Sequence, residues 1–286
     1  MTAATMALLP DRGIVRVAGQ DAEKLLQGII TNDMELLAKQ PAIHAALLTP
    51  QGKILFDFFV VRTADGFLLD AGREQADGLA KRLTIYKLRA NVAIADQSAS
   101  QQVLAVWGPS PHYEGRGSFP DSRLPELGLR CIVDSSFATE AGAEGTAEGF
   151  HSQRIALGVP EGGKDYAFGD TFPHEANFDA LGSISFTKGC FVGQEVVSRM
   201  QHRGLSRKRI VIVEGEGPLQ SGAEITVGAA TIGTIGSVAG KQGLALLRLD
   251  RAEEAICRGE RLVAAGSKIE MRRPDYLKPI GAASAS

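Results

Sequence analysis

The sequence predicts an α+β protein, with mixed helix and sheet subdomains in the first two thirds of the chain and a small β-barrel at the end. Strand-like and helix-like patterns alternate up to about residue 107, which is typical of mixed α/β subdomains. After about residue 206 there are only short apolar runs separated by turns that contain Gly, as in small barrels. A chain of 286 residues tends to divide its core, so we expect three domains, 1–100, 101–205 and 206–286.

The chain should open with a strand and a helix. Residues 13–19 contain Ile14, Val15 and Val17 and predict a strand. Asp21 then offers a carboxylate at the position that precedes a helix. Apolar residues follow at i, i+3, i+4, i+7 and i+8, which predicts an amphipathic helix with one buried face: Ala22, Leu25, Leu26, Ile29 and Ile30.

A hairpin is expected next. Two strand-like runs, 45–49 and 54–62, flank the turn Pro50-Gln51-Gly52, in which Pro restricts φ and Gly accepts a positive φ. The patterns then predict further strands at 67–70, 92–95 and 103–107 and a helix at 74–88. Residues 108–128 are rich in Gly, Pro and Ser and are expected to form a loop.

The last part of the chain predicts the barrel. Five short apolar runs are separated by turns that contain Gly: 210–213, 224–227, 230–235, 244–249 and 268–271. Short strands at such regular spacing are expected to close into a barrel or to stack as a sandwich.

Composition excludes several classes of protein. The formal net charge is −2, which argues against direct nucleic-acid binding. The three cysteines, Cys131, Cys190 and Cys257, are too far apart for a zinc site, and no metal site is predicted. They predict no disulfide framework, and so a reducing compartment. The start shows no signal-peptide pattern and no apolar run of about 18 residues occurs, so we expect a cytoplasmic protein without a membrane span.

The stretch Lys188-Gly-Cys-Phe-Val-Gly-Gln-Glu195 carries the chemistry. An apolar run ending at Phe186 predicts a strand, and the spacing after residue 195 predicts a helix that stops near Gly204. Cys190 should therefore lie at or just before a helix N-terminus, beside an ammonium group, and both favour a reactive thiolate. The alternative is a small buried Cys that only packs in a corner of the fold.

This octapeptide resembles the signature of the YgfZ family, K-G-C-Y/F-x-G-Q-E. The resemblance extends over residues 10–275 through several further stretches. These are Gly19-Gln-Asp-Ala22, Leu26-Gln-Gly28, Thr31-Asn-Asp33, Leu48-Thr-Pro-Gln-Gly-Lys-Ile-Leu-Phe-Asp57, Tyr86-Lys-Leu-Arg89, Arg154-Ile-Ala-Leu-Gly-Val-Pro160 and Pro173-His-Glu-Ala-Asn177.

The resemblance implies a fold like that of the glycine-cleavage T-protein, with intertwined ferredoxin-like subdomains around a central hole and a C-terminal β-barrel. It implies tetrahydrofolate binding in that hole. It also implies an accessory role in making or repairing the clusters of client iron–sulfur enzymes, such as tRNA-modifying enzymes. Cys190 would be the functional thiol, with Lys188 beside it. The residues expected at the folate are Asp57, Arg154, Glu175, Gly189, Gly193, Gln194, Glu195 and Arg199.

Two positions depart from the T-proteins that transfer an aminomethyl group. Those proteins resemble this chain but carry a paired Asp-Asp where it has Phe56-Asp57, and a pterin-binding Glu where it has Ala156. An Ala cannot accept the pterin N–H bonds, and losing such a contact costs about 1–3 kcal/mol. Folate-dependent aminomethyl transfer is therefore the alternative function, and it is uncertain whether the protein is an enzyme.

Several of these residues also have a structural interpretation. Asp57 could be a polar residue at a strand end, and Glu175 could cap a turn. Gly193 could allow close approach of a neighbouring strand, and Glu195 could complement a helix dipole. A basic cluster could bind the glutamyl tail of folate or simply be a solvated helix end: Arg199, His202, Arg203, Arg207, Lys208 and Arg209.

Overall fold

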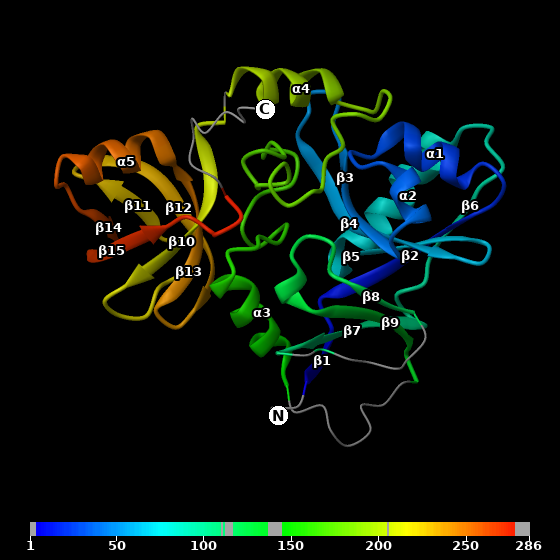
Figure 1. Cartoon of the computed structure of the whole chain (residues 1–286), viewed down its shortest axis with the longest axis horizontal. Helices are drawn as coiled ribbons and strands as arrows, with labels where there is room; N and C mark the ends of the chain where they lie inside the picture. The colour runs from blue at the N-terminus through cyan, green and yellow to red at the C-terminus, as the bar shows by residue number, and fades with distance from the viewer. Residues whose placement is uncertain (1–3, 110, 112–116, 137–144, 205, 278–286) are drawn as a thin grey trace. The chain divides into compact units, whose positions relative to one another are not determined.

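The computed structural model describes residues 4–109, 111, 117–136, 145–204 and 206–277 (Figure 1). The chain folds as two compact units. The first comprises Met1–Phe150 together with Gly182–Gln194, and the second comprises His151–Leu181 together with Glu195–Ser286. These units group residues differently from the predicted ranges 1–100, 101–205 and 206–286, because residues 101–150 and 182–194 belong with the beginning of the chain and residues 151–181 belong with its end.

The first unit contains a five-stranded antiparallel sheet in the order β3-β4-β5-β2-β6. Its strands are β2 (Arg12–Ala18), β3 (Ala42–Leu48), β4 (Ile54–Thr63), β5 (Gly66–Gly72) and β6 (Ala93–Asp96). The predicted hairpin is confirmed as β3 and β4, and Gly52 in its turn has φ of 79°. Local patterns were sufficient for this hairpin because β3 and β4 are joined by its turn, whereas β2 pairs with β5 and β6, which are far along the chain.

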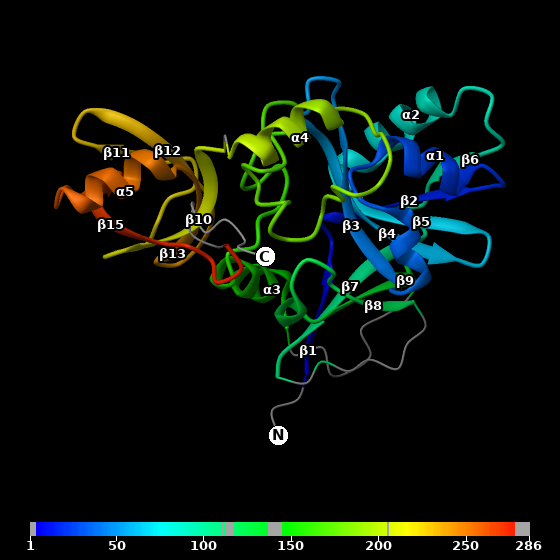
Figure 2. The ribbon, with the colours of Figure 1, turned by 45° about the horizontal axis from the view of Figure 1, so that its top comes forward.

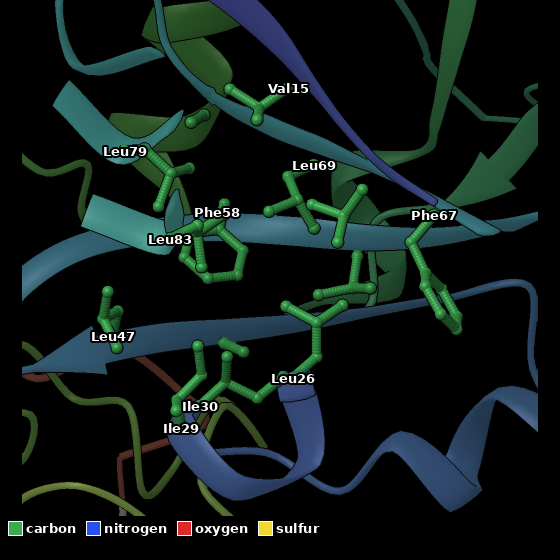
Figure 3. Packing of buried hydrophobic residues seen from close by; sticks show 14 of the residues in the cluster. Val15, Leu26, Ile29, Ile30, Leu47, Phe58, Phe67, Leu69, Leu79 and Leu83 are labelled. Carbon is green, nitrogen blue, oxygen red and sulfur yellow. The ribbon is translucent and has the colours of Figure 1, made fainter. Parts of the chain in front are cut away.

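Two helices cover one face of this sheet, α1 (Ala22–Ile29) and α2 (Ala76–Lys87). Figure 3 shows Leu26 and Ile29 of α1, and Leu79 and Leu83 of α2, directed at the strands. Asp21 precedes α1 as predicted, but its carboxylate accepts a hydrogen bond of 2.8 Å from the N–H of Asn91 and does not cap the helix.

A second sheet completes the first unit. It has the order β1-β7-β9-β8 and consists of β1 (Thr5–Leu9), β7 (Gln101–Trp107), β8 (Ser118–Pro120) and β9 (Leu129–Asp134). The prediction of a loop over 108–128 is wrong for β8 and for a 3₁₀ turn at Pro125–Leu127. Three residues ending in Pro carry no recognisable strand pattern, and β8 forms only because β9 offers an edge.

The two sheets of the first unit are joined by buried ion pairs. Nε of Arg12 donates to a carboxylate oxygen of Asp70 at 2.6 Å, and Nη1 of Arg130 donates to the other oxygen at 2.8 Å. Arg130 also donates to Asp121 at 3.0 Å, and Arg123 donates to Asp121 at 2.7 Å. All five side chains are buried. Removing any one of these charged side chains would leave the opposite charge of its partner uncompensated in the interior.

The second unit contains a closed barrel with the strand order β10-β13-β12-β11-β14-β15, as the sequence predicted. Its strands are β10 (Lys208–Gly215), β11 (Glu224–Val227), β12 (Ala230–Ala239), β13 (Gln242–Arg248), β14 (Leu262–Ala264) and β15 (Ser267–Arg272). The helix α5 (Leu249–Cys257) lies against the barrel and was not predicted (Figure 2). It buries Leu249, Ala252 and Ala255, which are spaced three residues apart. Two of these three residues are alanines, so the sequence shows no strong apolar periodicity there.

The remaining helical elements are α3 (Ala147–Ala156), α4 (Gln194–Arg203) and two short 3₁₀ segments, Met34–Ala38 and Arg73–Gln75. None of the helices in the described part of the chain is long and apolar enough to cross a lipid bilayer.

Candidate functional site

The octapeptide lies in an irregular segment that runs from Gly182 to Gly193 and leads into α4. The strand predicted to end at Phe186 does not form. The N–H of Ser185 donates to the carbonyl of Thr31 at 2.9 Å, and the segment is held by single bonds of this kind rather than by a strand ladder. The predicted helix after residue 195 is confirmed as α4, and Gly204, just after it, has φ of 57°.

Lys188 anchors this segment to the rest of the first unit. Its Nζ donates to the carbonyl of Ile30 at 2.9 Å and to the carbonyl of Asn32 at 2.8 Å, and it lies 5.4 Å from the ring centre of Phe191. Burial lowers the pKa of Lys188 to about 8, although the nearby Asp33 opposes that shift. The ammonium therefore serves two main-chain oxygens, a structural use that the sequence did not indicate.

A second anchor lies at the start of the segment. Oγ of Ser183 is 2.8 Å from Nδ1 of His44, and the carbonyl of Ser183 accepts a hydrogen bond of 2.8 Å from Oγ1 of Thr31. Nδ2 of Asn32 donates to the carbonyls of His44 and Gly182, both at 2.8 Å. Thr31 and Asn32 belong to one of the stretches that carry the family resemblance, but no role was predicted for them. Nothing in the sequence pairs them with residues 150 positions later.

Asp57 lies inside the first unit, in the middle of β4. It is buried, and its Oδ2 is 3.9 Å from Nε2 of His44. Burial, reinforced by Arg123, holds the pKa of His44 well below its usual value, so the imidazole is neutral at neutral pH. The strand-end position considered for Asp57 is therefore wrong. It belongs to a buried polar group together with His44.

The two glycines of the octapeptide have different environments. Gly193 has φ of 81°, and a Cβ atom there would lie 2.7 Å from the carbonyl oxygen of Thr49 and 3.0 Å from Cα of Gly52. Gly193 thus permits close approach to the turn between β3 and β4. A Cβ atom at Gly189 would meet no atom within 4 Å.

Cys190 is exposed, two residues after the Lys188 anchor and three residues before the Gly193 contact. The interpretation of Cys190 as a buried packing residue is therefore wrong. Cys131 is that kind of residue: it is buried, and burial raises the pKa of its thiol to about 12. Cys257, at the end of α5, is also exposed. An exposed thiol on an anchored segment can bind a metal ion or attack an electrophile.

The helix α4 begins at Gln194, directly after Gly193. Oε1 of Gln194 accepts a hydrogen bond of 3.3 Å from the N–H of Phe191, and the N–H of Gln194 donates back to the carbonyl of Phe191 at 3.2 Å. This reciprocal pair holds the turn between Cys190 and the helix. Glu195 and Arg199 are exposed on α4, one helical turn apart.

Two of the residues expected at the folate are engaged within the second unit. Arg154 is 1% exposed and donates to Asp165 at 2.6 Å, to the carbonyl of Val159 at 2.9 Å and to Oγ of Ser237 at 2.7 Å. Glu175 accepts a hydrogen bond of 2.9 Å from the N–H of Phe172, as in the turn-capping interpretation.

Of the basic cluster, Arg209 has a structural role within the second unit. It forms an ion pair with Asp179 and also donates to the carbonyl of His174 at 2.6 Å. The side chain of Arg203 lies outside the described part of the structure.

Two family models match the chain. The model described as the GCVT N-terminal domain matches residues 10–112, and the model described as the CAF17 C-terminal beta-barrel domain matches residues 207–279. The second match covers all six barrel strands.

The chain is similar to curated proteins and to solved structures. The mitochondrial iron–sulfur cluster assembly factor IBA57 of Mus musculus is 32% identical over 274 residues, which cover 84% of this chain and 76% of that protein. The IBA57 homolog of Mycosarcoma maydis, also mitochondrial by name, is 34% identical over 225 residues. Its match covers 72% of this chain and 56% of that protein, so the chain spans little more than half of the relative's length.

One similar solved structure is the glycine cleavage system aminomethyltransferase T of Bartonella henselae. It matches with a TM-score of 0.76 at 16% identity, over 96% of this chain and 86% of that one. This likeness confirms the predicted T-protein-like fold class.

Proposed function

This chain belongs to the family of the iron–sulfur cluster assembly factor IBA57, and from that membership we propose that it serves in the assembly or repair of iron–sulfur clusters. The clusters are those of client enzymes, which are its partners in this role. Cys190 is the thiol through which it acts.

The observation that carries this proposal is the placement of Cys190. The thiol is exposed, while the chain on both sides of it is fixed by the hydrogen bonds of Lys188 and by the close approach at Gly193. A fixed and accessible sulfur loses little conformational freedom when it binds a partner, so this arrangement favours ligand binding. A thiol that served only packing would be buried, as Cys131 is.

The proposed role of Cys190 follows from the ligands that iron–sulfur clusters require. Iron–sulfur clusters are held by cysteine thiolates, commonly four for each cluster. Cys190 would supply one of them, and the remaining ligands would come from the protein that shares the cluster. The cluster is cargo in this proposal, and the chain holds it only during transfer.

A complementation experiment tests the proposal. In cells that lack this protein, Cys190→Ala should fail to restore the activity of cluster-dependent enzymes, although the variant folds with a normal melting temperature. Cys257→Ala is the matched control, because it removes the other exposed cysteine, and it should complement fully. Full complementation by Cys190→Ala would overturn the role of the thiol.

Tetrahydrofolate binding is the second part of the proposal. Its support is the likeness of fold to an aminomethyltransferase T. Arg154 and Asp57 add no support, since both are buried inside their own units. Calorimetry with tetrahydrofolate tests the point: saturable heat would support binding, and its absence in folded protein would contradict it.

The subfamily and the cell compartment of the chain are two further parts of the proposal. The curated relatives bear the IBA57 name, so membership of the sister YgfZ group rests on the octapeptide and the other stretches that resemble that family. Those relatives are mitochondrial by name, whereas the sequence predicted the cytoplasm. Fractionation of cells that express the tagged protein distinguishes the two compartments.

A further inference from the structure

The end of α2 exposes apolar side chains to solvent. Leu88, the residue after the helix, is 85% exposed, and Ile85 is 64% exposed. Leu88 is the most exposed large hydrophobic residue in the described part of the chain. The same helix buries Leu79 and Leu83 in the core. Ile85 and Leu88 do not belong to that buried face. The function proposed above makes no use of them.

The backbone at Leu88 is strained. Its φ is 46° and its ψ is −108°, at the first central position of a turn closed by a hydrogen bond of 2.7 Å from the N–H of Ala90 to the carbonyl of Lys87. That position favours Gly, and a branched side chain there costs about 1–3 kcal/mol.

Neighbouring bonds impose this turn. Nζ of Lys87 donates to the carbonyl of Val92 at 2.8 Å, and Asp21 accepts from the N–H of Asn91. The fold therefore holds a Leu in solvent at a position where Gly would be more stable. Strain of this kind is typical of residues kept for an interaction rather than for stability.

Two arginines lie close to the apolar pair in the sequence: Arg82 is one helical turn before Ile85, and Arg89 directly follows Leu88. Arg82 and Arg89 are exposed, and neither forms an ion pair with another described residue. Lys81 differs, because Asp77 neutralises it at 2.7 Å. We call this surface the α2 patch; it consists of Arg82, Ile85, Leu88 and Arg89. It has an apolar centre and two guanidinium groups available to bind carboxylates.

We propose that the α2 patch is a docking surface for an acidic protein that carries the iron–sulfur cluster to or from this chain. The identity of the partner rests on the proposed function, while the surface itself rests on the strain, the exposure and the two arginines. An apolar anchor surrounded by charge is the usual organisation of a small protein interface. Two apolar side chains offer too little area for stable binding to a membrane.

Binding measurements with purified proteins test the proposal. The full chain is immobilised, and cluster-loaded iron–sulfur carrier proteins of the same cell are applied one at a time in biolayer interferometry. Leu88→Gly, and separately Arg82→Glu with Arg89→Glu, should each weaken the Kd for one acidic carrier about tenfold. Leu88→Gly should at the same time raise the melting temperature by about 2–4 °C, because it relieves the strain.

Ile256→Ser is the matched control, since Ile256 is an exposed apolar residue, 47% accessible, on α5. It should leave the Kd unchanged. The same series is measured with cluster-free carriers, to which Cys190 supplies no ligand, so that a failure of docking and a failure of the cluster role can be told apart. The proposal is overturned if no carrier binds the wild-type chain, if Leu88→Gly leaves the Kd unchanged, or if the patch variants instead lose binding to phosphatidylserine vesicles.

Discussion

Nζ of Lys188 donates a hydrogen bond of 2.8 Å to the carbonyl oxygen of Asn32, across 156 positions of the sequence. A second bond from the same nitrogen reaches Ile30. One side chain thus fixes the segment that carries Cys190 to the turn that follows α1. Much of the candidate site depends on this attachment.

Replacing Lys188 with Met should lower the free energy of unfolding by about 1–3 kcal/mol, because two buried carbonyls lose their donor. Urea denaturation measures the change. Lys39→Met is a control in the same unit, where the lysine is exposed, and it should change stability by less than about 0.5 kcal/mol. Equal stability of the two variants would refute the anchoring role.

Lys188 should also titrate near pH 8, because burial lowers its pKa. Its pKa in the unfolded chain is about 10.4, so the unfolded state binds more protons between these values. The contribution of this group to stability is therefore fully present above about pH 10.4 and is lost as the pH falls through 8. NMR of the Nζ group gives the midpoint directly. A midpoint near that of exposed lysines would contradict the expectation.

Gly193→Ala should destabilise the protein by about 1–3 kcal/mol. A Cβ atom would lie 2.7 Å from the carbonyl of Thr49, and φ of 81° is unfavourable for Ala. Gly189→Ala, in the same octapeptide, meets nothing within 4 Å and should be nearly neutral. Thermal unfolding of the pair separates the two cases, and similar melting temperatures would show that the close approach is not required.

Asp70→Asn should cost about 3–5 kcal/mol, because it leaves Arg12 and Arg130 without their shared carboxylate in the interior. Asp77→Asn breaks an exposed pair with Lys81 and should cost about 0.3–0.5 kcal/mol. Denaturant midpoints at neutral pH measure both. A small effect at Asp70 would mean that water reaches the charges.

Acid should remove stability that depends on Asp121. Burial alone would raise the pKa of Asp121, but Arg123 and Arg130 outweigh burial and hold that pKa far below its usual range. The stabilisation is present above the unfolded value of about 3.9 and is lost as the pH falls through the folded value. The unfolding free energy of Asp121→Asn should therefore fall less than that of the wild type between pH 5 and about pH 3.

The elements that sequence analysis predicted correctly are those with local signals. The β3–β4 hairpin has its turn residues between the two strands, and the barrel strands alternate with glycine turns. The strand β8 was missed because its three residues take their conformation from β9.

In the candidate site, the octapeptide predicted Cys190 as the functional thiol, and this thiol is exposed in the structure. The partners of Lys188, Ser183 and Asp57 could not be predicted, since each bond joins residues that only the folded chain brings together. Arg154 was expected at a ligand because of its motif, yet it donates to three groups inside the second unit.

The division of the first unit between residues 1–150 and residues 182–194 has a consequence for biosynthesis. While the ribosome is still adding the intervening residues, the nascent N-terminal region lacks Ser183 and Lys188, and the groups around His44 and Asn32 stay open to water. Completion of this unit must wait until the octapeptide has left the exit tunnel. Chaperones that hold emerging polypeptides would therefore meet complete sheets whose buried polar groups still lack their partners, for the time needed to translate that stretch.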